Sequence, residues 1–129
     1  MARSSSTRPT DSELEILGVL WNRGPSTVRE VHDQLNQVKP TGYTTVLKFM
    51  QIMAEKNLVR RTEIHRVHVY EAALPQQDTQ SQLVRDLATR AFGGSPLQLA
   101  MRALDTERAT ADELAQIRKM LDDCERRSK

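Results

Sequence analysis

The chain has 129 residues, about the length of one domain, which excludes large catalytic architectures such as an α/β barrel. Hydrophobic residues make up 38% of the positions and charged residues 28%, as in globular proteins, but aromatic residues supply only 4%, so the core must be aliphatic. The formal net charge is only +2, yet between Lys39 and His68 six basic residues stand against two acidic ones, and such a local basic patch favours a phosphate-bearing partner.

Residues 1–9 are rich in Ser and Arg, and we predict that they form a flexible tail. They lack the apolar segment of a signal peptide, and the longest uncharged stretch, 91–101, is well short of the ~18 residues that cross a membrane. The single cysteine, Cys124, cannot form an internal disulfide bond. These features predict a cytoplasmic protein.

Two helices are predicted before Pro40. Both begin with a Thr that is followed three residues later by Glu, the spacing of a capping box, in which each side chain bonds the other residue's backbone N–H group. The first box begins at Thr10, and its helix ends at Gly24. The second begins at Thr27, and its helix runs toward Asn36. In both, apolar residues recur every three or four positions and give the helix one face for a core.

A third helix is predicted from Thr41 to Asn57. Pro40 biases Lys39 away from helical geometry, Thr41 would cap the helix, and Asn57 tolerates the left-handed conformation that ends many helices. One face of this helix is apolar, with Val46, Leu47, Phe49, Met50 and Met53. The opposite stripe is polar, with Thr41, Thr44, Thr45, Lys48, Gln51 and Glu55. The helix is therefore predicted to bury one side and to present the other to a partner.

Residues 58–73 are mainly β-branched and basic, a composition that predicts two short strands joined by a turn near residues 64–66. The basic and histidine side chains of this hairpin are Arg60, Arg61, His65, Arg66 and His68. Such side chains suit contacts with phosphate groups. The alternative is that the charges only protect an exposed sheet edge from aggregation. The two interpretations are compatible.

Three further amphipathic helices are predicted, over residues 79–92, 95–104 and 110–126. The last contains a short seam of coiled-coil spacing, too short to be stable alone. Because these helices have no strand layer or fourth helix to complete a core, a second copy of the chain is predicted to supply it. The predicted dimer contacts are Leu83, Leu87, Phe92, Leu97, Met101, Leu104, Leu114, Ile117 and Leu121.

The order of three helices and a hairpin is that of a winged helix-turn-helix, in which the second helix of the turn motif enters the major groove of DNA. We therefore predict a mainly α fold, with a winged-helix DNA-binding domain over residues 10–74 and a helical dimerisation region over 75–129. The predicted DNA-binding residues are Thr41, Tyr43, Thr44, Thr45, Lys48, Arg60, Arg61, His65 and Arg66. The alternative for the third helix is that its threonines only cap it and Lys48 is a solvated charge.

Two sequence runs are distinctive: Thr27-Val28-Arg29-Glu30-Val31-His32 in the second helix and Tyr43-Thr44-Thr45-Val46-Leu47 in the third. With Lys56-Asn57-Leu58-Val59 and Phe92-Gly93-Gly94-Ser95, they resemble the penicillinase-repressor (BlaI/MecI/CopY) family of bacterial transcriptional repressors. The resemblance implies a homodimer that binds a pseudo-palindromic operator through its winged helices and represses by occupying the promoter. It also implies that the carboxy-terminal helices of the two subunits intertwine.

The sequence departs from the family where relatives sense their signals. In β-lactam-responsive members a membrane sensor protease cuts an Asn-Phe bond, and that position aligns here with Ala100-Met101, the candidate cleavage region. Copper-responsive members bind metal through a Cys-x-Cys tail, whereas this chain has only Cys124. His65 replaces a wing glycine, and we expect the turn to form because His tolerates positive φ. A membrane metalloprotease sensor is a candidate partner, and the inducing signal is left open.

No enzyme activity and no cofactor are predicted. The best catalytic alternative is a metal site, whose ligands would come from Glu63, His65, His68 and Glu71 with His32 or Cys124. Metal ligands must converge on one point, whereas residues three apart in a strand face opposite sides. No His-Glu-x-x-His, glycine-rich phosphate loop or Gly-x-Ser-x-Gly motif is present. The remaining alternative is a winged helix that binds only proteins, which would not need a basic third helix and wing.

Overall fold

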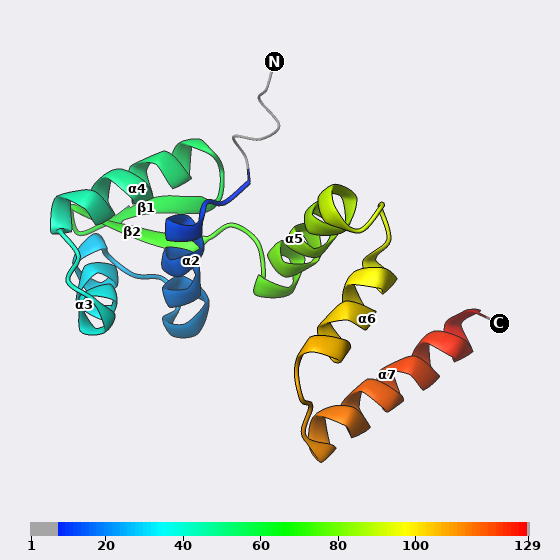
Figure 1. Cartoon of the computed structure of the whole chain (residues 1–129). Helices are drawn as coiled ribbons and strands as arrows, with labels where there is room; N and C mark the ends of the chain where they lie inside the picture. Colours follow the sequence, from blue (N-terminus) through cyan, green and yellow to red (C-terminus); the bar gives the residue numbers. More distant parts are fainter. Residues whose placement is uncertain (1–7, 129) are drawn as a thin grey trace. The chain divides into compact units, whose positions relative to one another are not determined.

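The computed structural model describes residues 8–128 of the chain, so most of the predicted flexible tail lies outside the described residues. Within that range six helices and two strands follow one another (Figure 1): α2 (Asp11–Arg23), α3 (Val28–Val38), α4 (Tyr43–Glu55), β1 (Val59–Ile64), β2 (Val67–Ala72), α5 (Gln76–Ala91), α6 (Pro96–Thr106) and α7 (Ala111–Ser128). This order confirms the predicted mainly α, winged-helix fold with a helical carboxy-terminal region.

The capping boxes predicted for the first two helices are both formed. The hydroxyl of Thr10 accepts a hydrogen bond from the Glu13 N–H at 3.2 Å, and the Glu13 carboxylate accepts one from the Thr10 N–H at 2.9 Å. The pair Thr27 and Glu30 repeats this geometry at the start of α3, with the same two distances. Each box satisfies two backbone donors that a helix start leaves unpaired, so the two helices begin where the sequence indicates.

The start of α4 corrects one prediction. The residue before the helix is Gly42, not Thr41, and it provides no side-chain cap. Lys39 adopts the extended conformation that Pro40 imposes, with φ −153° and ψ 150°, so Thr41 still belongs to the turn. Its hydroxyl donates backward to the Lys39 carbonyl at 2.9 Å and is therefore not available to cap α4. The helix ends at Glu55, two residues before the predicted end, but the left-handed conformation predicted for Asn57 is confirmed by its φ of 64°.

The wing is an antiparallel hairpin in which Val59 pairs with Ala72 and Ile64 pairs with Val67. Its two-residue turn, His65-Arg66, has positive φ at both positions, 51° and 66°, which is the requirement of a type I′ turn. The expectation for His65 is thus confirmed, and Arg66 shares the conformation. At its root the wing is joined to the segment between α2 and α3, since Ser26 and Tyr70 exchange two backbone hydrogen bonds of 2.8 and 2.9 Å.

A single aliphatic core fills the space between α2, α3, α4 and the hairpin. Its buried members are Ile16, Leu17, Leu20, Val28, Val31, Val46, Met50, Met53, Val59 and Tyr70. One ion pair lies beside this core: Nζ of Lys56 is 2.7 Å from the Glu13 carboxylate, and only 3% of the Glu13 side chain is exposed. Since Glu13 also closes the capping box of α2, it ties the start of α2 to the end of α4.

The chain divides into two compact units, of which the first ends at Thr79 and the second begins at Gln80. In the second unit Ser95 caps α6, Pro96 occupies its first position, and Thr110 and Glu113 form the predicted capping box of α7. Helices α5, α6 and α7 make few contacts with one another (Figure 1). Among the described residues of α6 and α7 none is buried. The second unit is therefore a string of well-formed helices without a core of its own.

Candidate nucleic-acid interface

The polar stripe of α4 lies on the solvent side of the helix. Thr44, Thr45 and Lys48 are exposed, whereas Val46 and Met50 are buried in the core. Because residues three and four positions apart share one face of a helix, the three exposed side chains form one ridge over the first two turns. Hydroxyl and ammonium groups in this arrangement suit the edges of bases and the phosphates of a DNA groove. We call Thr44, Thr45 and Lys48 the α4 ridge.

Two of the predicted DNA-binding residues make contacts within the protein and do not belong to this ridge. Thr41 is half-buried in the turn before the helix. Tyr43 opens the helix, and its ring is packed against α3: the His32 ring meets it edge-on with the ring centres 5.7 Å apart, and the Arg29 guanidinium lies 5.9 Å from the ring centre. The Tyr43 side chain remains 43% exposed, so its outer part is still accessible.

The wing carries its basic side chains on both faces. Arg60 and Arg61 are neighbours in β1, opposite Glu71 and Tyr70 of β2, so their side chains point to opposite sides of the sheet. Arg66 and His65 occupy the turn at the tip. All four are exposed. A ligand lying against one face of the wing could therefore contact only one of the two β1 arginines together with the tip.

Some charged side chains near the interface form ion pairs within the protein, and others do not. Arg23 lies 3.0 Å from Glu30. The backbone hydrogen bond from Thr27 and, to a lesser degree, the Arg23 charge hold the pKa of the Glu30 carboxyl below its ordinary value of 4.5. In the wing, His68 lies 3.9 Å from Glu63. Within residues 8–128 the basic side chains of the α4 ridge and wing that form no ion pair are Lys48, Arg60, Arg61 and Arg66.

The predicted catalytic alternative finds no support in residues 8–128, where no cluster of His, Cys, Asp and Glu could hold a metal ion. His65 lies at the wing tip, whereas His32 lies in α3 and binds the Thr41 carbonyl.

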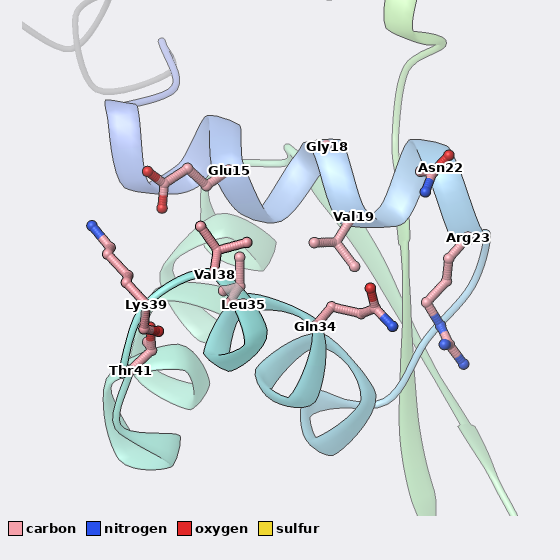
Figure 2. Close-up of a pocket in the computed structure, with 10 residues that line it drawn as sticks. All are labelled: Glu15, Gly18, Val19, Asn22, Arg23, Gln34, Leu35, Val38, Lys39 and Thr41. Atoms are coloured by element: carbon pink, nitrogen blue, oxygen red, sulfur yellow. The ribbon is translucent and has the colours of Figure 1, made fainter.

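A groove of about 400 Å³ lies between α2 and α3 (Figure 2). Its lining residues include the ionisable side chains of Glu15, Arg23 and Lys39 but no Cys, His or Ser. None of the helices within residues 8–128 is both long and apolar enough to traverse a bilayer.

The residues predicted for dimerisation are distributed along α5, α6 and α7. Leu83, Phe92 and Ile117 are half-buried, and the remaining six are exposed: Leu87, Leu97, Met101, Leu104, Leu114 and Leu121. Ala100 and Met101, the candidate cleavage region, lie exposed within α6. Cys124 is exposed on α7, where the Arg127 guanidinium donates to its sulfur at 3.1 Å. Most of the predicted dimer contacts are thus exposed on the surface of the second unit.

Two residues of α3 that were not predicted to belong to the nucleic-acid interface contact the start of α4. Arg29 and His32 of α3 both contact Tyr43, and His32 also binds the Thr41 carbonyl. A signal was present, since both residues belong to the distinctive Thr27–His32 run. Their partners, however, lie nine or more residues along the chain, across the Pro40 turn, so their role depends on how α3 and α4 pack.

Comparison with known proteins agrees with this architecture. A family profile described as penicillinase repressor matches residues 9–123. The transcriptional regulator BlaI of Mycobacterium tuberculosis strain H37Rv is 33% identical over 120 residues, which cover 92% of this chain and 86% of that protein. The penicillinase repressors of Bacillus licheniformis and Staphylococcus aureus are 19% and 15% identical, over 93% and 87% of this chain and 94% and 89% of their own lengths. The chain belongs to the penicillinase repressor family.

Proposed function

We propose that the protein is a sequence-specific, DNA-binding transcriptional repressor that occupies a pseudo-palindromic operator as a homodimer. The observation that carries the proposal is the α4 ridge, an exposed polar stripe on a helix whose opposite face is buried in a winged-helix core. Family membership supports the same function, because the matched relatives are a transcriptional regulator and penicillinase repressors. The basic side chains of α4 and the wing that form no ion pair within residues 8–128 supply the charge that phosphate binding requires.

The contacts with DNA divide into two kinds. Thr44, Thr45 and Lys48 would enter the major groove with α4, where Lys48 can reach the O6 and N7 atoms of guanine. Arg66 at the wing tip would contact phosphates of the neighbouring backbone, which adds affinity without reading sequence. The first group therefore determines which site is bound, and the second strengthens binding to every site.

The second unit would supply the dimer. Its exposed apolar faces on α6 and α7 have no covering layer within the described chain, and a second copy offers a matching surface. A two-fold dimer presents two α4 ridges to one duplex, which predicts half-sites about one helical turn, or a multiple of it, apart. Cleavage of α6 near Ala100-Met101 by a membrane metalloprotease sensor, or another signal that separates the subunits, would release the operator.

Selection of duplexes from a random library, followed by affinity measurements at two salt concentrations, tests the proposal. We expect the wild-type protein to enrich a palindromic sequence and to bind it less tightly as salt rises. Lys48→Ala should change the preference among sites by roughly 1–3 kcal/mol, whereas Arg66→Ala should weaken all sequences about equally.

Lys119→Ala is the matched control, because Lys119 is also an exposed cation but lies on α7 away from the leucine seam. A protein that enriches no sequence and binds DNA independently of salt and of Lys48 would refute operator binding. That result would favour the alternative, a winged helix that binds only proteins.

A further inference from the structure

The start of α4 is held differently from the starts of α2, α3, α6 and α7. Helices α2, α3 and α7 begin with reciprocal Thr/Glu capping boxes and α6 begins with a serine cap, whereas Gly42 gives α4 no side-chain cap. The first bond within α4, from the Val46 N–H to the Gly42 carbonyl, measures 3.2 Å. The helix that we propose to read DNA therefore depends on other residues to fix its first turn.

Two side chains of α3 hold the residue that precedes this start. His32 and Asn36 are four residues apart, so they lie on one face of α3. Nε2 of His32 lies 2.7 Å from the carbonyl oxygen of Thr41, and Oδ1 of Asn36 accepts a 2.9 Å hydrogen bond from the Thr41 N–H. A carbonyl oxygen can only accept, so Nε2 of the imidazole must carry the proton. Both backbone polar groups of Thr41 are thus bound from α3.

His32 contacts the chain on both sides of Gly42. Its Nε2 atom binds Thr41 before the glycine, and its ring packs edge-on against Tyr43 after it, with an angle of 76° between the ring planes. Only 19% of the His32 side chain is exposed, so the ring is held in this place by its surroundings. These contacts locate the first residue of α4 relative to α3 without using any group of the α4 ridge.

We propose that His32 and Asn36 are positioning residues that fix where α4 begins, and thereby where the α4 ridge meets DNA. The inference rests on the proposed DNA binding by α4. A helix of 13 residues moves as a stiff body, so a shift at its first residue is carried to every side chain of the ridge. Specific contacts tolerate displacements of only about 0.5 Å, whereas long basic side chains can still reach phosphates. Loss of the pair should therefore reduce sequence discrimination more than general DNA affinity.

The test uses three variants of α3 and one matched control. His32→Leu and Asn36→Leu each remove one bond to Thr41, and His32→Gln restores a side-chain N–H donor of similar reach. Gln37→Leu makes the same kind of change at an exposed neighbour outside the pair. If His32→Leu fails to fold, Asn36→Leu still decides the result, because Asn36 is exposed and its side chain is not part of the core.

The first measurement needs no DNA. Hydrogen exchange of the Thr41 amide should become about tenfold faster in Asn36→Leu, which removes the acceptor of that amide. Exchange of the Val46 amide should become faster in both leucine variants, because the first turn of α4 opens more readily once its anchor to α3 is weakened. It should stay at the wild-type rate in Gln37→Leu and return toward it in His32→Gln. Exchange in the two leucine variants that matches the control would overturn the proposal.

The second measurement is the ratio of dissociation constants for a duplex selected by the wild-type protein and for its scrambled counterpart. We expect this ratio to fall about tenfold in the leucine variants while affinity for the scrambled duplex changes less than about twofold. An equal loss on both duplexes would overturn the positioning role. If the wild-type protein itself does not distinguish the duplexes, the proposed function fails, and hydrogen exchange alone then decides whether the pair holds α4.

Discussion

The two units of the chain use their apolar residues in opposite ways. In the first unit the side chains of Ile16, Met50 and Tyr70 are at most 1% exposed and lie in one core. Among the described residues of the second unit only Ala88 is buried, while Leu97 is 75% and Leu121 60% exposed. Both units have well-formed, mostly capped helices, so local signals alone do not separate them. The difference lies in packing: the first unit closes a core within one chain, whereas the second leaves most of its large apolar side chains exposed.

The largest effect is expected from a charge in the α7 seam. Leu114→Asp or Leu121→Asp should prevent dimerisation and weaken operator binding by about 10²–10⁴-fold, because two half-sites no longer act together. Light scattering checks the mass and fluorescence anisotropy checks binding. Ala115→Asp introduces the same charge at an exposed position beside the seam and should leave both unchanged. A seam variant that is still a dimer with normal affinity would contradict the role of the second unit.

A cavity in the core of the first unit should lower folding stability without changing the oligomeric state. Met50→Ala deletes a side chain that is fully buried in the core, which should lower the free energy of unfolding by about 2–5 kcal/mol. The oligomeric state of the folded protein should not change, because Met50 belongs to the first unit. Ile52→Ala on the same helix, where 38% of the side chain is exposed, is the control and should cost much less. Urea unfolding followed by circular dichroism measures both; equal costs would argue against the described core.

The smallest effect concerns pH and the capping box of α3. The folded-state pKa of Glu30 is held below its ordinary value of 4.5, so its carboxylate stabilises the first unit at neutral pH. That contribution should be fully present above about pH 4.5 and be lost as the pH falls through the lowered folded-state value. Glu30→Gln should therefore be less stable at pH 7 and lose less stability on acidification. Glu113→Gln removes the carboxylate from the capping box of α7 in the second unit and is the matched control. If stability falls with pH in Glu30→Gln as it does in the wild-type protein, Glu30 is not the source of this pH dependence.

Much of the fold could be predicted because its signals are local. The Thr-x-x-Glu boxes, the turn before α4 and the change to β-branched residues at the wing each lie within a few residues. The start of α5 was misplaced at Thr79: the helix begins at Gln76, directly after Pro75, whose carbonyl accepts from the Asp78 N–H at 3.1 Å. A proline just before the helix was a usable signal that the prediction passed over.

The parts that could not be predicted depend on contacts between distant segments. The buried ion pair joins Glu13 to Lys56, 43 residues along the chain, and neither residue's neighbours indicate it. Thr41 was expected to cap α4 because threonine is a common capping residue. In the structure its polar groups are instead bonded to Lys39, His32 and Asn36. The exposed residues of the candidate site could therefore be selected from the sequence, whereas the contacts of His32 and Asn36 with Thr41 depend on how α3 and α4 pack.

Hydroxyl-radical footprinting of the wild-type protein on its selected duplex is the decisive experiment for operator binding by a dimer, because it records which parts of the duplex backbone the bound protein covers. We expect two protected patches related by a two-fold axis, on one face of the duplex and about one helical turn or a multiple of it apart. Protection that is uniform along the duplex, or confined to a single half-site at saturation, would contradict operator binding by a dimer.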